Sequence, residues 1–100
     1  MVMTFEDFKQ SLTGSTPPAG LTGALTGLWW DGKGNWGRAH ECAQEDSSSA
    51  GSWVHAYLHR KEGDDSNAAY WYRQAHQPVC QEPLESEWLN IAGTLLAENR

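Results

Sequence analysis

The chain has 100 residues, of which 39% are hydrophobic and 20% charged, a composition typical of one globular domain rather than a disordered segment. Its formal net charge of −6, with the basic residues scattered, argues against nucleic acid binding, which needs cations to displace counterions from phosphate. No apolar run approaches the roughly 18 residues of a membrane span. The first residues, MVMTFEDFKQSL, are not those of a signal peptide, so we expect a cytoplasmic protein.

The first third of the chain predicts two helices separated by a loop. Residues 4–12 predict a short helix, because Thr4 can cap it and apolar side chains recur on one face. Residues 13–20, TGSTPPAG, are rich in helix breakers and predict the loop. Apolar residues at helical spacing over 21–29 predict the second helix, which the glycines of DGKG bring to an end.

The middle of the chain predicts three more helices. Asn35 can cap a helix that extends to the polar residues 46–49, where the chain turns again. Residues 52–76, SWVHAYLHRKEGDDSNAAYWYRQAH, then predict a complete helical hairpin. Gly63 is expected to end its first helix, because glycine takes the left-handed backbone conformation without steric cost. The helix 52–62 carries large side chains on every side, so we expect it to be central.

The last segment predicts a connector and a sixth helix. Residues 77–83 contain two prolines, and Pro83 is well placed at the start of a helix over 84–98. No segment shows the sustained alternation of a strand. We therefore expect residues 1–100 to form a single all-α domain, a compact bundle of about six helices. Its two stacked hairpins would span residues 21–76, with capping helices at both ends.

The two predicted hairpins resemble each other and a known repeat family. Gly63 and Ala68 lie 29 positions after Gly34 and Ala39, and a fixed period of helical hairpins is typical of stacked arrays. The pattern Gly63-x-x-x-x-Ala68, followed by Tyr72 and the YWYRQA sequence, resembles the tetratricopeptide repeat. The chain is also similar to small bacterial proteins that share a WxHAxLHRxEGD…NAxYWYR core, a likeness that implies no activity. The repeat resemblance implies an array of helical hairpins and does not identify a ligand.

Three residues on the helix 52–62 form a candidate metal site. His55, His59 and Glu62 recur at helical spacing, so their side chains point in one direction. Imidazole and carboxylate are ligands of zinc and of other divalent ions, and His40 or His76 from another helix could complete the set. The alternative is that these histidines are packed imidazoles, hydrogen-bonded to backbone or to acidic side chains, that hold the helices in register.

A second stripe of the same helix predicts a recognition surface. Trp53, Tyr57 and Arg60 share one side of it, and Trp71 and Arg73 from the next helix are expected to join them. Aromatic walls beside an arginine suit a peptide or a small anionic ligand, because the guanidinium binds a carboxylate while the rings make apolar contacts. The alternative is a core tryptophan beside a surface arginine that pairs with an acid.

These patterns favour a non-enzymatic interaction module that binds a peptide, a protein or a small anionic ligand and needs no cofactor. The alternative is a metal-binding protein or small metal-dependent enzyme centred on the histidine stripe, with zinc or another divalent ion bound. Neither a phosphate-binding glycine loop nor a GxSxG nucleophile motif occurs. Asn67 is expected either to cap a helix or to contact His59. The protein could be a monomer or a homodimer.

Overall fold

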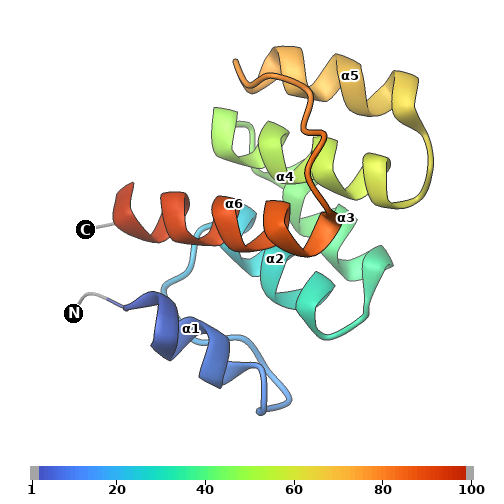
Figure 1. The fold of residues 1–100 in the computed structure, drawn as a ribbon. Coiled ribbons are helices and arrows are strands. Elements are labelled where there is room, and N and C mark those ends of the chain that lie inside the picture. Colours follow the sequence, from blue (N-terminus) through green and yellow to red (C-terminus); the bar gives the residue numbers. More distant parts are fainter. Residues whose placement is uncertain (1–2, 99–100) are drawn as a thin grey trace.

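The computed structural model describes residues 3–98, which form six α-helices and no strand (Figure 1). The helices are α1 (Phe5–Ser11), α2 (Gly23–Gly32), α3 (Trp36–Glu45), α4 (Ser49–Lys61), α5 (Asp65–Gln74) and α6 (Leu84–Glu98). The predicted all-α class and the number of helices are confirmed. No helix among the described residues is both long and apolar enough to cross a membrane.

Polar side chains at five helix starts explain where these helices begin. The caps, whose side chains accept a backbone N–H of the first turn, are Thr4, Thr22, Asn35, Ser48 and Asp64. The start of α4 differs from the prediction, because this helix begins at Ser49 rather than at Ser52. The Ser48 hydroxyl accepts from the Gly51 N–H and donates to Asp46 Oδ1, so the preceding turn is shorter than expected.

Two matching turns connect α2 to α3 and α4 to α5. Gly34 and Gly63 both take left-handed backbone conformations, with φ of 83° and 90°, as predicted for Gly63. The next residue in each turn donates its N–H to a carbonyl five positions earlier, Asn35 to Trp30 and Asp64 to His59, both at 2.9 Å. The two turns therefore close their helices with the same hydrogen-bond pattern, 29 positions apart.

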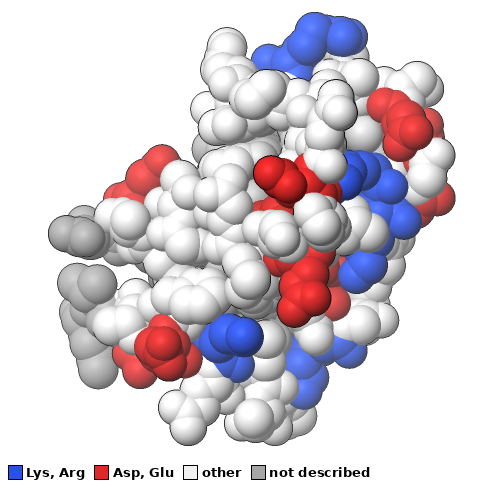
Figure 2. Space-filling view, viewed as in Figure 1, with Lys and Arg blue, Asp and Glu red and all other residues white. Residues whose placement is uncertain are grey.

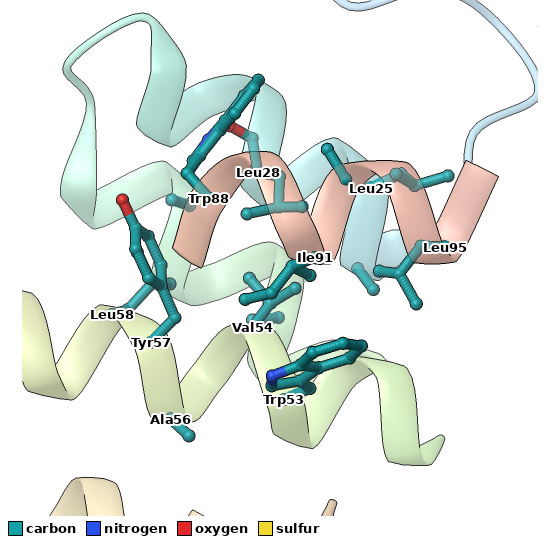
Figure 3. Packing of buried hydrophobic residues seen from close by; sticks show 14 of the residues in the cluster. Leu25, Leu28, Trp53, Val54, Ala56, Tyr57, Leu58, Trp88, Ile91 and Leu95 are labelled. Atoms are coloured by element: carbon teal, nitrogen blue, oxygen red, sulfur yellow. The ribbon is translucent and has the colours of Figure 1, made fainter. Parts of the chain in front are cut away.

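Helix α4 lies at the centre of the molecule, as expected from its large side chains. It packs against α2, α3, α5 and α6, and every residue over 53–59 is buried. Helix α6 crosses the face formed by α2 and α4, and α1 lies along its edge (Figure 1). Figure 3 shows Val54 directed from α4 towards Ile91 of α6, whereas Ala56 points the other way, towards α5. This arrangement places two faces of α4 in different surroundings.

Candidate functional site

Three histidine rings converge where α3 packs against α4. His40 comes from α3, and His55 and His59 come from successive turns of α4. One ring nitrogen of each lies within 4.8 Å of the other two. The ring centroids of His40 are 4.6 Å from His55 and 5.2 Å from His59, and the two α4 rings are 4.8 Å apart. The structure thus brings together the two histidines of the predicted stripe and the predicted partner from another helix.

Two tryptophans wall this histidine cluster. Trp71 of α5 stacks on His55, with ring centroids 4.0 Å apart and planes 13° from parallel. Trp36 stacks on His40 at 4.9 Å and meets the edge of His59 at 6.1 Å. The Trp36 indole N–H donates to the Leu58 carbonyl at 2.9 Å, so this wall is anchored to α4. The two indole rings cover two sides of the cluster. The half-buried His40 is on the side that faces solvent.

The ring of His59 is oriented by two hydrogen-bond partners. Its Nδ1 lies 2.7 Å from Glu62 Oε2, and since a carboxylate only accepts, this nitrogen carries the proton. In the neutral ring the lone pair is then on Nε2, which lies 3.4 Å from the Asn67 amide nitrogen. Of the two roles predicted for Asn67, the structure shows the contact with His59. The cap of α5 is Asp64 instead. A carboxylate on the far nitrogen of a histidine is a common support for metal ligation.

The rings of His40 and His55 have different surroundings from that of His59. Within residues 3–98 their ring nitrogens make no hydrogen bond to protein groups. His55 is only 4% exposed, but no side-chain nitrogen or oxygen in this part of the chain is both fully buried and unpaired, so its ring nitrogens keep some contact with solvent. Burial, and then the neighbouring His40 and His59, lower the pKa of His55 to about 4. Burial and His59 also lower the pKa of His40. Both rings are therefore neutral near pH 7, and neutral imidazole is the form that ligates metal ions.

The other two predicted ligands lie elsewhere. Glu62 is exposed and forms a separate acidic group with Asp64 around His59, so it supports a ring of the cluster instead of joining the three histidines. His76 is exposed at the end of α5, where its backbone takes a φ of 60°, and it does not belong to the histidine cluster.

The low pKa of His55 predicts acid sensitivity in the chelator-treated protein. The unfolded chain binds a proton on His55 near its ordinary pKa of 6.5, whereas the folded protein resists it down to about pH 4. The part of the stability that depends on a neutral His55 is therefore fully present above pH 6.5 and is lost as the pH falls towards about 4. His40 and His59 are the titratable groups beside this ring, and α5 faces it with the uncharged Trp71.

Thermal melts between about pH 7.5 and about pH 5.5 measure this loss in a range where most carboxylates stay ionised. We expect the melting temperature of the wild type to fall more steeply than that of His55→Gln, which cannot titrate. Equal slopes for the two proteins would contradict the prediction.

The predicted recognition stripe of α4 lies under α6. Trp53 and Tyr57 are buried, and Figure 3 shows both directed from α4 towards α6. Trp71 lies on another side of α4, against His55, and Arg73 is exposed on α5. The five residues therefore do not share one open surface, because the C-terminal helix covers the side of α4 that carries Trp53 and Tyr57.

Arg60, the charged member of that stripe, pairs with a buried acid. Its Nη1 lies 2.8 Å from Oε1 of Glu87, which is 2% exposed, and its Nη2 donates to the Glu82 carbonyl. The Tyr72 hydroxyl donates to the other oxygen of Glu87. Burial and this carboxylate raise the pKa of the Tyr72 hydroxyl, which remains a donor. This network joins α4, α5 and α6 and matches the alternative reading of Arg60 as an ion-pair partner.

Tyr57 reaches a cleft on another part of the surface. The cleft has a volume of about 350 Å³. Its walls come from α1, α2, α4 and α6 and consist of Lys9, Leu12, Asp31, Gly32, Tyr57, Lys61, Leu84, Glu85, Trp88 and Leu89. Asp31, 5% exposed, accepts from the Tyr57 hydroxyl at 2.9 Å and pairs with Lys61 Nζ at 2.8 Å. Figure 2 shows acidic and basic side chains interspersed on this side, near the N-terminal end of α6.

Sequence reasoning missed several residues of both sites. Trp36 lies one helical turn before His40, the same spacing as His55 and His59, and this repeated interval was a usable signal. Asp31 follows two tryptophans, and its burial has no signature in the sequence.

Comparison with protein families, curated proteins and solved structures finds no match to this chain. The tetratricopeptide resemblance therefore stays a prediction, and any function must be argued from the two sites themselves.

Proposed function

We propose that this protein binds a transition-metal ion, zinc or a similar divalent ion, through His40, His55 and His59. The observation that carries the proposal is the convergence of three imidazoles, two of which have no hydrogen-bond partner within residues 3–98. Histidines that only hold helices in register are expected to be hydrogen-bonded to protein groups. The ring nitrogens of His40 and His55 instead keep some contact with solvent, because no side-chain nitrogen or oxygen among residues 3–98 is both buried and unpaired. An ion bound between the rings would coordinate these solvent-accessible nitrogens.

The chemistry of the donor set suits zinc, copper, nickel or cobalt. Imidazole nitrogen is a preferred ligand of these ions, whereas calcium and magnesium prefer oxygen. Zinc–nitrogen bonds of about 2.0–2.1 Å in a tetrahedral site separate ligand nitrogens by about 3.3 Å. The three nitrogens lie within 4.8 Å of one another, so modest side-chain rotations would bring them to that spacing. Glu62 would hold the His59 ring in the required tautomer.

Zinc titration of the chelator-treated protein tests the proposal. We expect one ion per chain by calorimetry and by elemental analysis after gel filtration. At a free zinc concentration about 100 times the dissociation constant, binding adds about 2.7 kcal/mol of stability. For a domain of this size that raises the melting temperature by about 10 °C or more. No binding heat and an unchanged melting temperature with zinc, copper, nickel and cobalt would overturn it.

The second candidate function is the binding of a small anionic ligand, as the sequence predicts, but in the cleft beside Tyr57 instead of on the Trp53 stripe. The volume of about 350 Å³ falls within the range of small-molecule sites. Trp88 and leucines offer apolar contact, and Lys9 is a cation at the rim. Lys61 neutralises Asp31 and has further N–H donors to offer. These features favour a carboxylate with an apolar body.

Phenylacetate and octanoate are suitable probes for the cleft. We expect dissociation constants of about 1 mM, with NMR shift changes confined to residues that line the cleft. Lys9→Ala should weaken binding several-fold, whereas Arg73→Ala, at an exposed site on α5, should leave it unchanged. Shift changes centred on Arg73, or none at about 10 mM of either probe, would exclude this candidate.

A further inference from the structure

The histidine cluster offers three protein ligands, one fewer than a closed zinc site. Among residues 3–98, no carboxylate, thiol or fourth imidazole lies within 4.8 Å of all three histidine donors. The nearest acid, Glu62, is already the partner of His59 Nδ1. Structural zinc sites use four protein ligands, whereas sites that take water or substrate use three and leave one position open.

The side chains that contact the rings also leave that position without an anionic or imidazole donor. Asn67 brings an amide to within 3.4 Å of His59 Nε2, but an amide oxygen suits calcium or magnesium better than zinc. Trp36 and Trp71 face the rings with aromatic surfaces, which do not ligate a metal ion. The Trp36 indole N–H is used by the Leu58 carbonyl. His40 is half-buried, so the cluster meets solvent on the side of α3.

We infer that a metal ion held by His40, His55 and His59 keeps one coordination position open to solvent and binds water or a small monodentate anion there. This inference rests on the proposed metal-binding function and adds to it a class of ligand: azide, thiocyanate, bicarbonate or a small carboxylate. The aromatic walls favour compact anions, because Trp36 and Trp71 leave little room beside the rings.

Cobalt(II) in the full chain makes the open position visible. Binding of one cobalt ion should give the visible d–d bands of a tetrahedral site, and these bands should be lost in His55→Ala. Addition of azide or thiocyanate should then change the shape and intensity of the bands, with a dissociation constant of about 1–10 mM. Cobalt bands that no anion alters would overturn the inference and leave the metal-binding proposal intact. Absence of both cobalt and zinc binding would instead remove the proposed function.

Glu62→Gln provides the discriminating variant. Its amide oxygen can still accept from His59 Nδ1, so the ring keeps its orientation while the carboxylate is lost. We expect this variant to bind cobalt more weakly, by up to about 100-fold, because a carboxylate that supports a ligand is lost. Once it is saturated with cobalt, it should keep the anion response of the wild type. A response that appears only in Glu62→Gln would show that the carboxylate fills the fourth position, and would overturn the inference.

Discussion

Replacement of His55 by alanine should lower the affinity for zinc by about 100-fold or more. Loss of residues that merely support a metal ligand costs about 10–100-fold, and loss of a ligand from a three-histidine set costs at least as much. His55 is the strongest choice because its ring is buried, neutral and stacked on Trp71, so no solvent-exposed group can replace it. Calorimetric titration of the wild type and the variant at one pH measures the difference.

Two further variants separate metal ligation from packing. His40→Ala removes a half-buried ring, so it should weaken zinc binding with a smaller effect on stability in the presence of chelator. His76→Ala removes an exposed ring outside the cluster and should bind zinc like the wild type. Wild-type affinity in both His40→Ala and His55→Ala, with the fold intact by circular dichroism, would contradict the assignment of the cluster.

Replacement of Glu87 by alanine should cost about 1.5–3 kcal/mol of unfolding free energy, the loss expected for hydrogen bonds to a charged group. Arg60 keeps the Glu82 carbonyl as an acceptor and is 21% exposed, so its charge is not left fully buried. The variant leaves the Arg60 guanidinium and the Tyr72 hydroxyl without the carboxylate that both contact in the wild type. A charge that loses its partner in a buried pair is penalised more heavily than the intact pair was worth. Urea denaturation measures the cost, and the m-value shows whether the transition stays two-state.

Glu85→Ala is the matched control for this experiment, because Glu85 lies on the same helical turn but is exposed. This variant should change the free energy of unfolding by no more than about 0.5 kcal/mol. The double variant Arg60→Met, Glu87→Leu should recover much of the loss, since an apolar pair needs no charge partner. A cost below about 1 kcal/mol for Glu87→Ala would mean that solvent reaches Arg60 and Tyr72 readily.

The helices could be predicted because their limits are set by local chemistry. Asn35 caps α3 through its own side chain, and Gly63 closes α4 through its own backbone. The central position of α4 also followed from the sequence, since large side chains surround it. The start of α4 was misplaced because the Ser48 cap lies in a polar stretch with several possible caps.

The sites were harder to predict, because they depend on which helix covers which face of α4. The spacing of His55 and His59 gives their common direction, but only the packing of α3 brings His40 beside them. Likewise, the spacing of Trp53 and Tyr57 predicts an exposed binding face, but in the fold α6 covers both side chains. A helix with large side chains all round carries no local signal for which side meets solvent.

The position of the histidines on the most enclosed helix affects how the cluster would adapt to ions of different size. His55 and His59 lie on α4, which packs against four other helices, so the backbone that carries these two donors is held firmly. His40 stands on α3 and is half-buried, so it has more rotational freedom. Two buried donors on one firmly held helix lose less entropy on binding, and one adjustable donor tolerates different ionic radii. The cluster should therefore discriminate among metal ions by their affinity for nitrogen ligands more than by their ionic radius.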